Sequence, residues 1–255
     1  MSSREIEGLT VEIEGTGPAV MMVHGLGGTS NTFTPLAGPL VSRFQVIRPD
    51  LPGAGRSRMD PSATLPDIAG RLLRLVDALG VDEVQLVGHS LGTVLCQQLA
   101  VLAPARVRRM MLFGPVLEPP EAGRQALRER AAAARLHGMS DIADAIVAGS
   151  LARETRADRP LVVALVRELL MRQPPEGYAR LCEALADARK VELGVIGCPV
   201  LLVTGDQDPT SPAAACEAMC AALPQAQLEI LPECGHWACL EQVDAGRHLL
   251  ARFLD

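Results

Sequence analysis

The sequence predicts an α/β fold in which a mostly parallel, twisted sheet carries helices on both faces. Two observations lead to this prediction. Apolar, strand-like runs alternate with helix-like stretches along most of the 255 residues, and this alternation is typical of parallel strands joined by helical crossovers. In addition, an apolar run over residues 84–88 passes through Gly88-His-Ser-Leu-Gly92 into a helix-like segment. That order places a serine at the carboxyl end of a strand.

Composition sets limits on partners and location. Hydrophobic residues make up 48% of the chain but aromatic residues only 2%, so the core must consist mainly of aliphatic side chains. The formal charge of -6 and the lack of a basic patch argue against a nucleic-acid partner. The first five residues lack the apolar core of a signal peptide, and no apolar run could span a bilayer. We therefore expect a cytoplasmic protein with no membrane partner.

The first half of the chain reads as sheet and crossover helices. Alternating residues 3–6 and 9–14 predict an edge hairpin, whereas residues 19–23 are apolar throughout, as in a central parallel strand. Residues 65–79 form an amphipathic pattern with apolar side chains on one face. The remaining expected elements are a helix over 31–42, strands over 44–48 and 107–113, a loop over 50–57 and a helix over 93–102.

Strand signals stop between residues 118 and 190. We expect helices over 125–136, 141–151, 161–171 and 177–188, separated by prolines. Strands over 200–204 and 227–231 and helices over 213–222 and 239–254 then resume the earlier order. We interpret residues 1–117 and 191–255 as one core domain and 118–190 as a helical cap. A separate all-helical domain is the alternative, which the short connections disfavour.

Ser90 is the candidate nucleophile. A turn from strand to helix this tight forces its residue into a strained backbone conformation and leaves its hydroxyl exposed above the sheet. Side chains at Gly88 and Gly92 would collide with the neighbouring strand or helix. The alternative is an ordinary turn in which Ser90 only caps the helix, and it fails only if a base, an acid and an oxyanion site exist elsewhere.

His236 is the candidate base among the five histidines. It follows the last expected strand, and loops at that edge of a parallel sheet face the same crevice as the serine turn. The other four have different expected places: His24 bracing its own loop, His89 inside the turn beside Ser90, His137 in the cap and His248 on the solvated last helix.

Asp208 is the candidate acid, in Gly205-Asp-Gln-Asp-Pro209. Asp206 comes directly off the strand and is expected to brace the turn, whereas Asp208 lies deeper in the loop and reaches further toward a histidine. The resulting chain order is Ser90, Asp208, His236, an order known for serine hydrolases that act through a nucleophile, a base and an orienting carboxylate.

An oxyanion site requires two backbone N–H donors. The N–H of Leu91, next after the serine, is one, and we expect Leu26 in His24-Gly-Leu-Gly-Gly28 to supply the other. The glycines could instead form a phosphate-binding loop, but the sequence has neither Gly-Lys-Ser/Thr nor a Gly-x-Gly-x-x-Gly that leads into a helix. A zinc site from Cys216, Cys220, Cys234 and Cys239 is also conceivable; their spacing matches no standard pattern, so we expect free thiols and no metal.

With these motifs the chain resembles the α/β-hydrolase superfamily over its whole length. The similarity rests on the stretches already quoted, on Gly235-His236 and on Asp50-Leu-Pro-Gly-Ala-Gly-Arg-Ser57. In the cap, residues 135–139, 142–146 and 175–185 are similar to 3-oxoadipate enol-lactonases and related lactonases. Those enzymes usually carry Trp-Phe where this chain has Ser150-Leu151, and their first loop commonly begins with Asn instead of His24-Gly25.

The resemblance implies a cofactor-free serine hydrolase acting on a small-molecule carboxylic ester or lactone through an acyl-enzyme. Perhydrolysis of the haloperoxidase kind and hydrolysis of a carbon–carbon bond are alternatives on the same scaffold, and a ligand-binding receptor without turnover is a third. The oligomeric state is open, a homo-oligomer included. Because Tyr178 is the only aromatic residue of the cap, we expect an apolar, roomy pocket, with arginines such as Arg135 and Arg153 on solvated faces.

Overall fold

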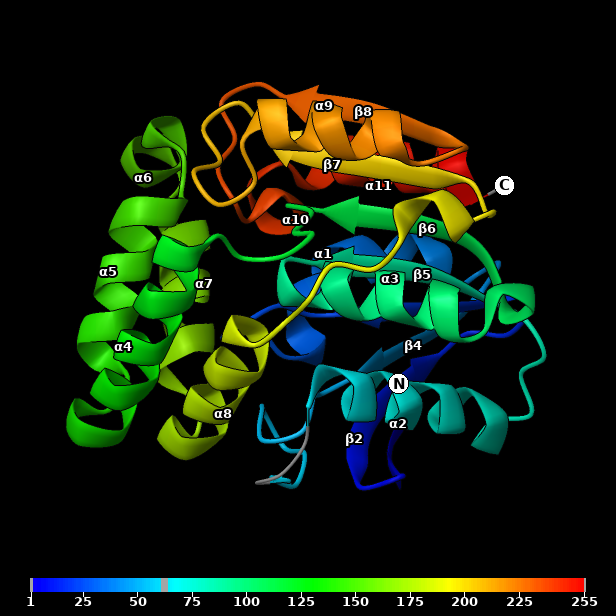
Figure 1. The fold of residues 1–255 in the computed structure, drawn as a ribbon, viewed down its shortest axis with the longest axis horizontal. Coiled ribbons are helices and arrows are strands. Elements are labelled where there is room, and N and C mark those ends of the chain that lie inside the picture. Colours follow the sequence, from blue (N-terminus) through cyan, green and yellow to red (C-terminus); the bar gives the residue numbers. More distant parts are fainter. Residues whose placement is uncertain (1, 61–63, 255) are drawn as a thin grey trace.

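An eight-stranded sheet forms the centre of the computed structural model, which describes residues 2–60 and 64–254. The strand order is β1-β2-β4-β3-β5-β6-β7-β8, with β1, β2 and β4 paired antiparallel and the other neighbours parallel. The parallel strands point toward one side of the molecule (Figure 1). The strands are β1 (Ser2–Ile6), β2 (Leu9–Glu14), β3 (Ala19–Val23), β4 (Gln45–Pro49), β5 (Val84–His89), β6 (Val107–Phe113), β7 (Val200–Gly205) and β8 (Ala226–Leu231).

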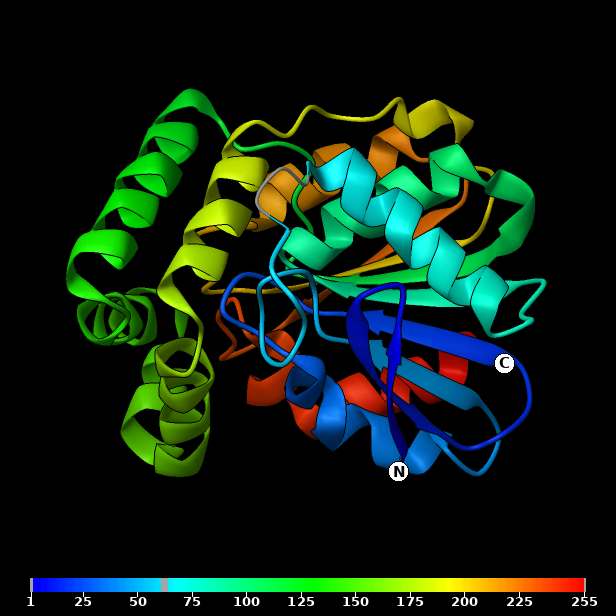
Figure 2. The ribbon, with the colours of Figure 1, turned by 90° about the horizontal axis from the view of Figure 1, so that it is seen from below.

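Helices cover both faces of this sheet, as the alternation in the sequence predicts. Figures 1 and 2 show α2, α3 and α9 on one face and α1 and α11 on the other. α2 buries Ile68, Leu72, Leu75 and Val76, which are apolar at helical spacing. The helices of the two faces are α1 (Thr34–Ala37), α2 (Leu65–Ala78), α3 (Leu91–Leu102), α9 (Ala213–Ala222), α10 (Ala238–Glu241) and α11 (Val243–Leu254), with 3₁₀ turns η3 (Pro104–Arg106) and η4 (Leu193–Val195).

Five helices between β6 and β7 gather at the side toward which the parallel strands point (Figure 1). We call residues 118–190, which contain them, the insertion. Within it α4 packs along α8, and α5 packs along α7. Four helices are expected from the sequence, and the additional short one, α6, forms in the segment that precedes Pro160. The helices are α4 (Glu121–His137), α5 (Ser140–Ser150), α6 (Arg153–Asp158), α7 (Pro160–Met171) and α8 (Pro175–Ala186).

Two of the expected helices are wrong in detail. The helix expected over residues 31–42 is a series of short turns, η1 (Ser30–Phe33), α1 and η2 (Gly38–Leu40). Pro35 and Pro39 explain this, because proline has no N–H for a continuous helical ladder. The helix expected over 239–254 breaks at Gln242 into α10 and α11. The backbone of Gln242 leaves the helical region, with φ -124° and ψ 58°, and its side-chain amide donates to the carbonyl of Pro232 at 3.0 Å.

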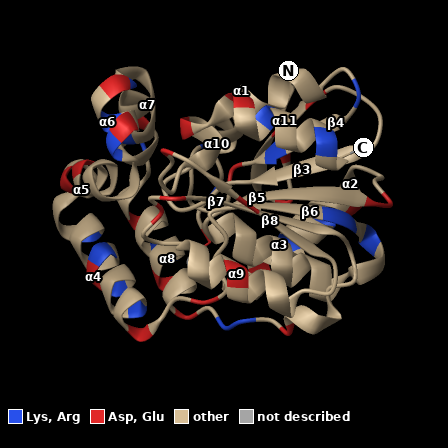
Figure 3. Cartoon of the chain, turned by 90° about the horizontal axis from the view of Figure 1, so that it is seen from above, with Lys and Arg blue, Asp and Glu red and all other residues tan. Residues whose placement is uncertain are grey.

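Charged residues lie mainly on the outer helices and loops, while the central strands are nearly free of them (Figure 3). α4 carries four arginines and two glutamates, so both signs of charge occur along it. No helix in the described ranges has the length and apolar character needed to cross a membrane. The central sheet is therefore apolar, and polar side chains that could bind or react with a ligand lie in the loops at the carboxyl ends of its strands.

Candidate active site

Ser90 occupies a strained turn between β5 and α3. Its backbone angles are φ 52° and ψ -118°, in a region that L residues adopt at a cost of about 1–3 kcal/mol. The turn is held by the Ser90 N–H, which donates to the Phe113 carbonyl at 3.0 Å, and by the Ser90 carbonyl, which accepts from the Thr93 N–H at 2.8 Å and its hydroxyl at 2.6 Å. The strain predicted from the motif is therefore present.

The glycines on either side of Ser90 leave room that no other residue would leave. A Cβ on Gly92 would lie 2.0 Å from the carbonyl oxygen of Val23, and one on Gly88 would lie 2.8 Å from the Gly92 carbonyl oxygen. Both contacts are with backbone, which cannot swing aside as a flexible side chain can. The expected collision with a neighbouring strand and helix is confirmed.

The structure brings His236 and Asp208 together, although they lie in loops after different strands. His236 Nδ1 is 2.8 Å from Asp208 Oδ2. The other carboxylate oxygen accepts the N–H groups of Thr210 and Ser211 at 2.8 and 2.9 Å. Burial alone would raise the pKa of Asp208, but the charge of His236, their hydrogen bond and these two N–H groups together hold that pKa below its usual value. Asp208 is therefore an ionised acceptor that orients the imidazole.

Asp206 has a different place, as the sequence analysis expects. Its Oδ1 accepts the N–H of Cys234 at 3.1 Å and thereby braces the loop that carries His236. Its role is to shape that loop, and the carboxylate that contacts the imidazole is that of Asp208.

The backbone of His236 is also held. Its N–H donates to the Ser150 carbonyl at 2.7 Å, and its carbonyl accepts from His89 Nε2 at 2.9 Å. A carbonyl can only accept, so His89 Nε2 carries the proton. Burial, followed by the nearby His236, lowers the pKa of His89 to about 3, which keeps this ring neutral. His89 is thus a fixed donor beneath His236.

The loop of residues 24–28 lies next to Ser90. A Cβ on Gly25 would come within 2.7 Å of the Ser90 Cβ. His24 braces the loop as expected: Nδ1 donates to the Gly25 carbonyl at 2.8 Å, and Nε2 accepts the Leu51 N–H at 2.9 Å. In the described part of the chain, the N–H groups of Leu26 and Leu91 have no hydrogen-bond partner. Both are therefore available to donate to the oxyanion of a substrate.

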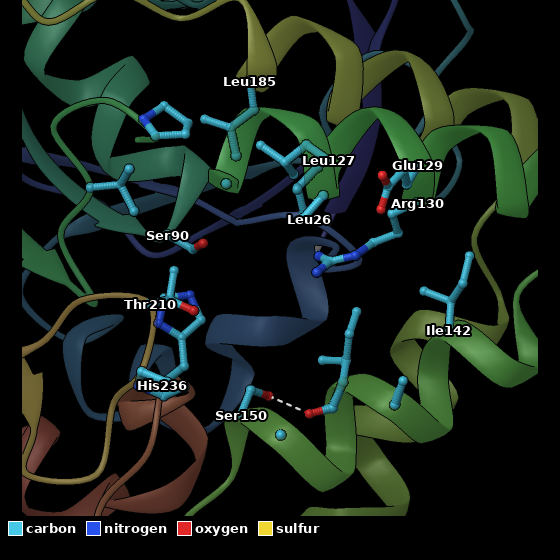
Figure 4. A pocket seen from close by; sticks show the side chains of 18 of the residues that line it. Leu26, Ser90, Leu127, Glu129, Arg130, Ile142, Ser150, Leu185, Thr210 and His236 are labelled. Atoms are coloured by element: carbon cyan, nitrogen blue, oxygen red, sulfur yellow. Dashed lines mark hydrogen bonds between the residues drawn. The ribbon is translucent and has the colours of Figure 1, made fainter. Parts of the chain in front are cut away.

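A cavity of about 760 Å³ opens in front of these residues, between the sheet edge and the insertion. Figure 4 shows Ser90, His236, Leu26 and Thr210 at its wall. Most other lining side chains are aliphatic or small, so the expectation of an apolar, roomy pocket is met over most of its surface. They include Val116, Leu127, Ala133, Ile142, Ala145, Ile146 and Leu185.

Two lining residues were missed from the sequence. Trp237 forms an aromatic wall, with its indole N–H on Ser150 Oγ at 3.1 Å, whereas Tyr178 is buried outside the cavity. Arg130 extends from α4 into the cavity (Figure 4). Its position three residues after Leu127, on the same face of the helix, was an available signal. Arg135, by contrast, pairs with glutamates of α8, as expected of a solvated arginine.

The cysteines do not assemble into a metal site. Within residues 2–60 and 64–254, no group of three histidine, cysteine or acidic side chains could hold a metal ion. All seven cysteines are free thiols, and five of them are buried. Burial raises the pKa of Cys234 and Cys239 well above the usual range, so both thiols stay protonated.

Comparison with known proteins agrees with this architecture. The family model of the α/β hydrolase fold matches residues 18–147 and 149–243. The chain is 29% identical to 3-oxoadipate enol-lactonase 2 of Acinetobacter baylyi (91% of this chain, 86% of the relative) and 28% identical to 2-hydroxy-6-oxo-6-phenylhexa-2,4-dienoate hydrolase of Burkholderia cepacia (94% and 88%). A thermophilic esterase from Thermogutta terrifontis superposes with a TM-score of 0.94 at 26% identity, over 100% of this chain and 98% of the esterase. The chain therefore belongs to the α/β hydrolase fold family.

Proposed function

We propose that this protein is a serine hydrolase that cleaves a carboxylic ester or lactone through an acyl-enzyme. One observation carries the proposal: a strained serine and a carboxylate-bound histidine line the same cavity. Similarity to an esterase and to an enol-lactonase supports the same class of reaction. Residues 1–117 and 191–255 would form the core domain and residues 118–190 a cap over the site.

In the first step, His236 takes the proton of the Ser90 hydroxyl as its oxygen attacks the substrate carbonyl. The resulting oxyanion accepts hydrogen bonds from the N–H groups of Leu26 and Leu91, which are available for it. Asp208 stabilises the imidazolium and keeps the ring oriented. The imidazolium then protonates the leaving alkoxide, so the ester bond breaks and Ser90 is acylated.

In the second step, His236 takes a proton from water, and the hydroxide attacks the acyl carbon. The second oxyanion collapses, the Ser90 oxygen leaves with the proton returned by His236, and a carboxylic acid is released. For a lactone, alcohol and acid belong to one opened molecule. The two steps together consume only the substrate and one water molecule. The proposed partner is therefore a small-molecule ester or lactone.

Arg130 favours a substrate with a carboxylate away from the reacting carbonyl. Of the other charged lining residues, Glu118 pairs with Arg124 at 3.2 Å, Glu129 accepts from Gln125 at 2.9 Å, and Asp141 lies in the first turn of α5. Within the described ranges no carboxylate lies within ion-pairing distance of Arg130. The guanidinium of Arg130 lies near the Tyr178 hydroxyl, which does not balance its charge. A guanidinium without a carboxylate partner in a mostly apolar cavity is stabilised by an anion, and a carboxylate matches its planar donors. We therefore propose one carboxylate on an otherwise apolar substrate.

Perhydrolysis, carbon–carbon hydrolysis and a receptor without turnover remain alternatives. A p-nitrophenyl ester separates the receptor from the enzyme: a hydrolase gives a burst of product followed by steady turnover, whereas a receptor gives no sustained turnover. Activity that depends on added peroxide would point to a perhydrolase. A panel of short esters, γ-lactones and enol-lactones, run beside Ser90→Ala, would then rank the substrates. The cytoplasmic location stays a prediction, and the oligomeric state stays open.

A further inference from the structure

Glu241 is a buried carboxylate that does not line the cavity, yet it lies next to the residues that do. Its side chain, at the end of α10, is 1% exposed. Oε1 accepts the N–H groups of Gly235 and Trp237 at 3.1 and 3.0 Å, and Oε2 accepts the N–H of Ala152 at 2.8 Å. One carboxylate thus holds both neighbours of His236 and one residue of the insertion.

The insertion contacts the same loop through Ser150. Its carbonyl accepts the N–H of His236 at 2.7 Å, and its hydroxyl accepts the indole N–H of Trp237 at 3.1 Å. The fit leaves no space, because a Cβ on Gly235 would lie 2.3 Å from the Ser150 carbonyl oxygen. The three consecutive residues 235–237 are therefore tied to the segment 150–152 directly and through Glu241.

We infer that Glu241 is a positioning residue that ties the loop of the base His236 to the insertion. The packing of the insertion over the cavity and the position of the base then depend on each other. The inference rests on the proposed function. It assigns the two connections different effects. The Glu241 connection holds the backbone on both sides of His236 and should act on turnover. The Ser150 hydroxyl holds only the Trp237 indole and should act on substrate binding.

Glu241→Gln tests the first connection. The amide keeps the shape of the side chain but turns one acceptor into an N–H donor that faces a backbone N–H group, so at least one of the three bonds is lost. Small displacements of a catalytic group cost up to a hundredfold in rate. We expect kcat per active site to fall about 10- to 100-fold with KM within about twofold. The matched control is Glu233→Gln, an exposed acid in the same loop, which should leave both constants unchanged.

Ser150→Ala tests the second connection. It removes the acceptor of a buried indole N–H and should raise KM about three- to tenfold with kcat per site within about twofold. Sites are counted by fluorophosphonate titration, because misfolding lowers the number of reactive sites but not the turnover of each. Unchanged turnover per site in Glu241→Gln would overturn the positioning role, and an equal effect of both variants on KM and kcat would overturn the division between them.

Hydrogen exchange measures the coupling without activity. In Glu241→Gln, protection should fall in peptides from both 147–153 and 233–240, since the carboxylate bonds to both. Loss confined to 233–240 would mean that Glu241 supports only its own loop, and the coupling would be refuted. A failure of the proposed function looks different: the parent chain would show no turnover and no labelling of Ser90, while the exchange result would still decide the coupling.

Discussion

Replacing Asp208 by asparagine tests the proposed triad at one atom. Oδ1 of Asp208 accepts two backbone N–H groups, from Thr210 and Ser211. In Asp208→Asn the amide oxygen must keep that place, so the amide nitrogen faces His236 Nδ1 across the 2.8 Å contact. Nδ1 must then accept, and the ring proton moves to Nε2. That nitrogen would no longer be able to take a proton from Ser90.

The expected magnitude follows from the loss of the base alone. The wrong tautomer should lower kcat by about ten thousandfold, equivalent to about 5.5 kcal/mol in the barrier. The hydrogen bonds from the N–H groups of Thr210 and Ser211 are both kept in Asp208→Asn, so the free energy of unfolding should change by no more than about 1 kcal/mol. Asp206→Asn is the control: its oxygen can still accept the Cys234 N–H, and kcat should fall less than about threefold.

The assay is hydrolysis of a p-nitrophenyl ester per fluorophosphonate-titrated site, with urea unfolding of each variant measured beside it. A loss below tenfold in Asp208→Asn would refute the assignment of the acid. A larger loss in Asp206→Asn than in Asp208→Asn would transfer the role to Asp206.

Three further predictions concern the surroundings of the triad. Gly92→Ala should destabilise the fold by about 3 kcal/mol and abolish activity, since its Cβ would lie 2.0 Å from a carbonyl oxygen; a parent-like urea midpoint would contradict it. Arg130→Met should lower kcat/KM about 10- to 100-fold for a carboxylate-bearing half-ester but less than threefold for its neutral methyl analogue; an equal loss on both would refute the carboxylate subsite. Because the pKa of His89 is about 3 in the folded state and near 6.5 unfolded, the unfolded chain binds the proton first. His89 thus contributes stability that is complete above pH 6.5 and lost as the pH falls toward 3, by up to about 1.4 kcal/mol per pH unit; urea unfolding of His89→Gln at pH 7 and 5 should show a smaller decrease than the parent, and an equal one would refute the assignment.

The features that could be predicted from the sequence are those set by residues adjacent in the chain or by the order of the strands. The turn around Ser90 needs a strand, two glycines and a helix in immediate succession, so its strained geometry was predictable. His236 and Asp208 follow neighbouring parallel strands, whose carboxyl ends must meet at one edge of the sheet. The break in the helix expected over 31–42 was also visible, in two prolines.

The rest depends on how the insertion docks, and no local pattern encodes that. Trp237 meets Ser150 across 87 residues of sequence, and Glu241 meets Ala152 across 89. The one aromatic residue of the cap, Tyr178, is buried away from the cavity, and the aromatic side chain that lines it is Trp237, from the loop after β8. Arg130 shares a helix face with the apolar Leu127, which is a signal in the sequence, but that signal does not say what the face lies against. The packing of α4 along α8, across the cavity from the sheet, turns Arg130 toward the cavity.

The most direct test of the account is the site of covalent labelling by a fluorophosphonate, read by peptide mass spectrometry together with ester hydrolysis by Ser90→Ala. If Ser90 is the nucleophile, a single adduct forms, on Ser90, and Ser90→Ala hydrolyses the ester at least about a thousandfold more slowly than the parent. An adduct on another residue, or parental activity in Ser90→Ala, would contradict it.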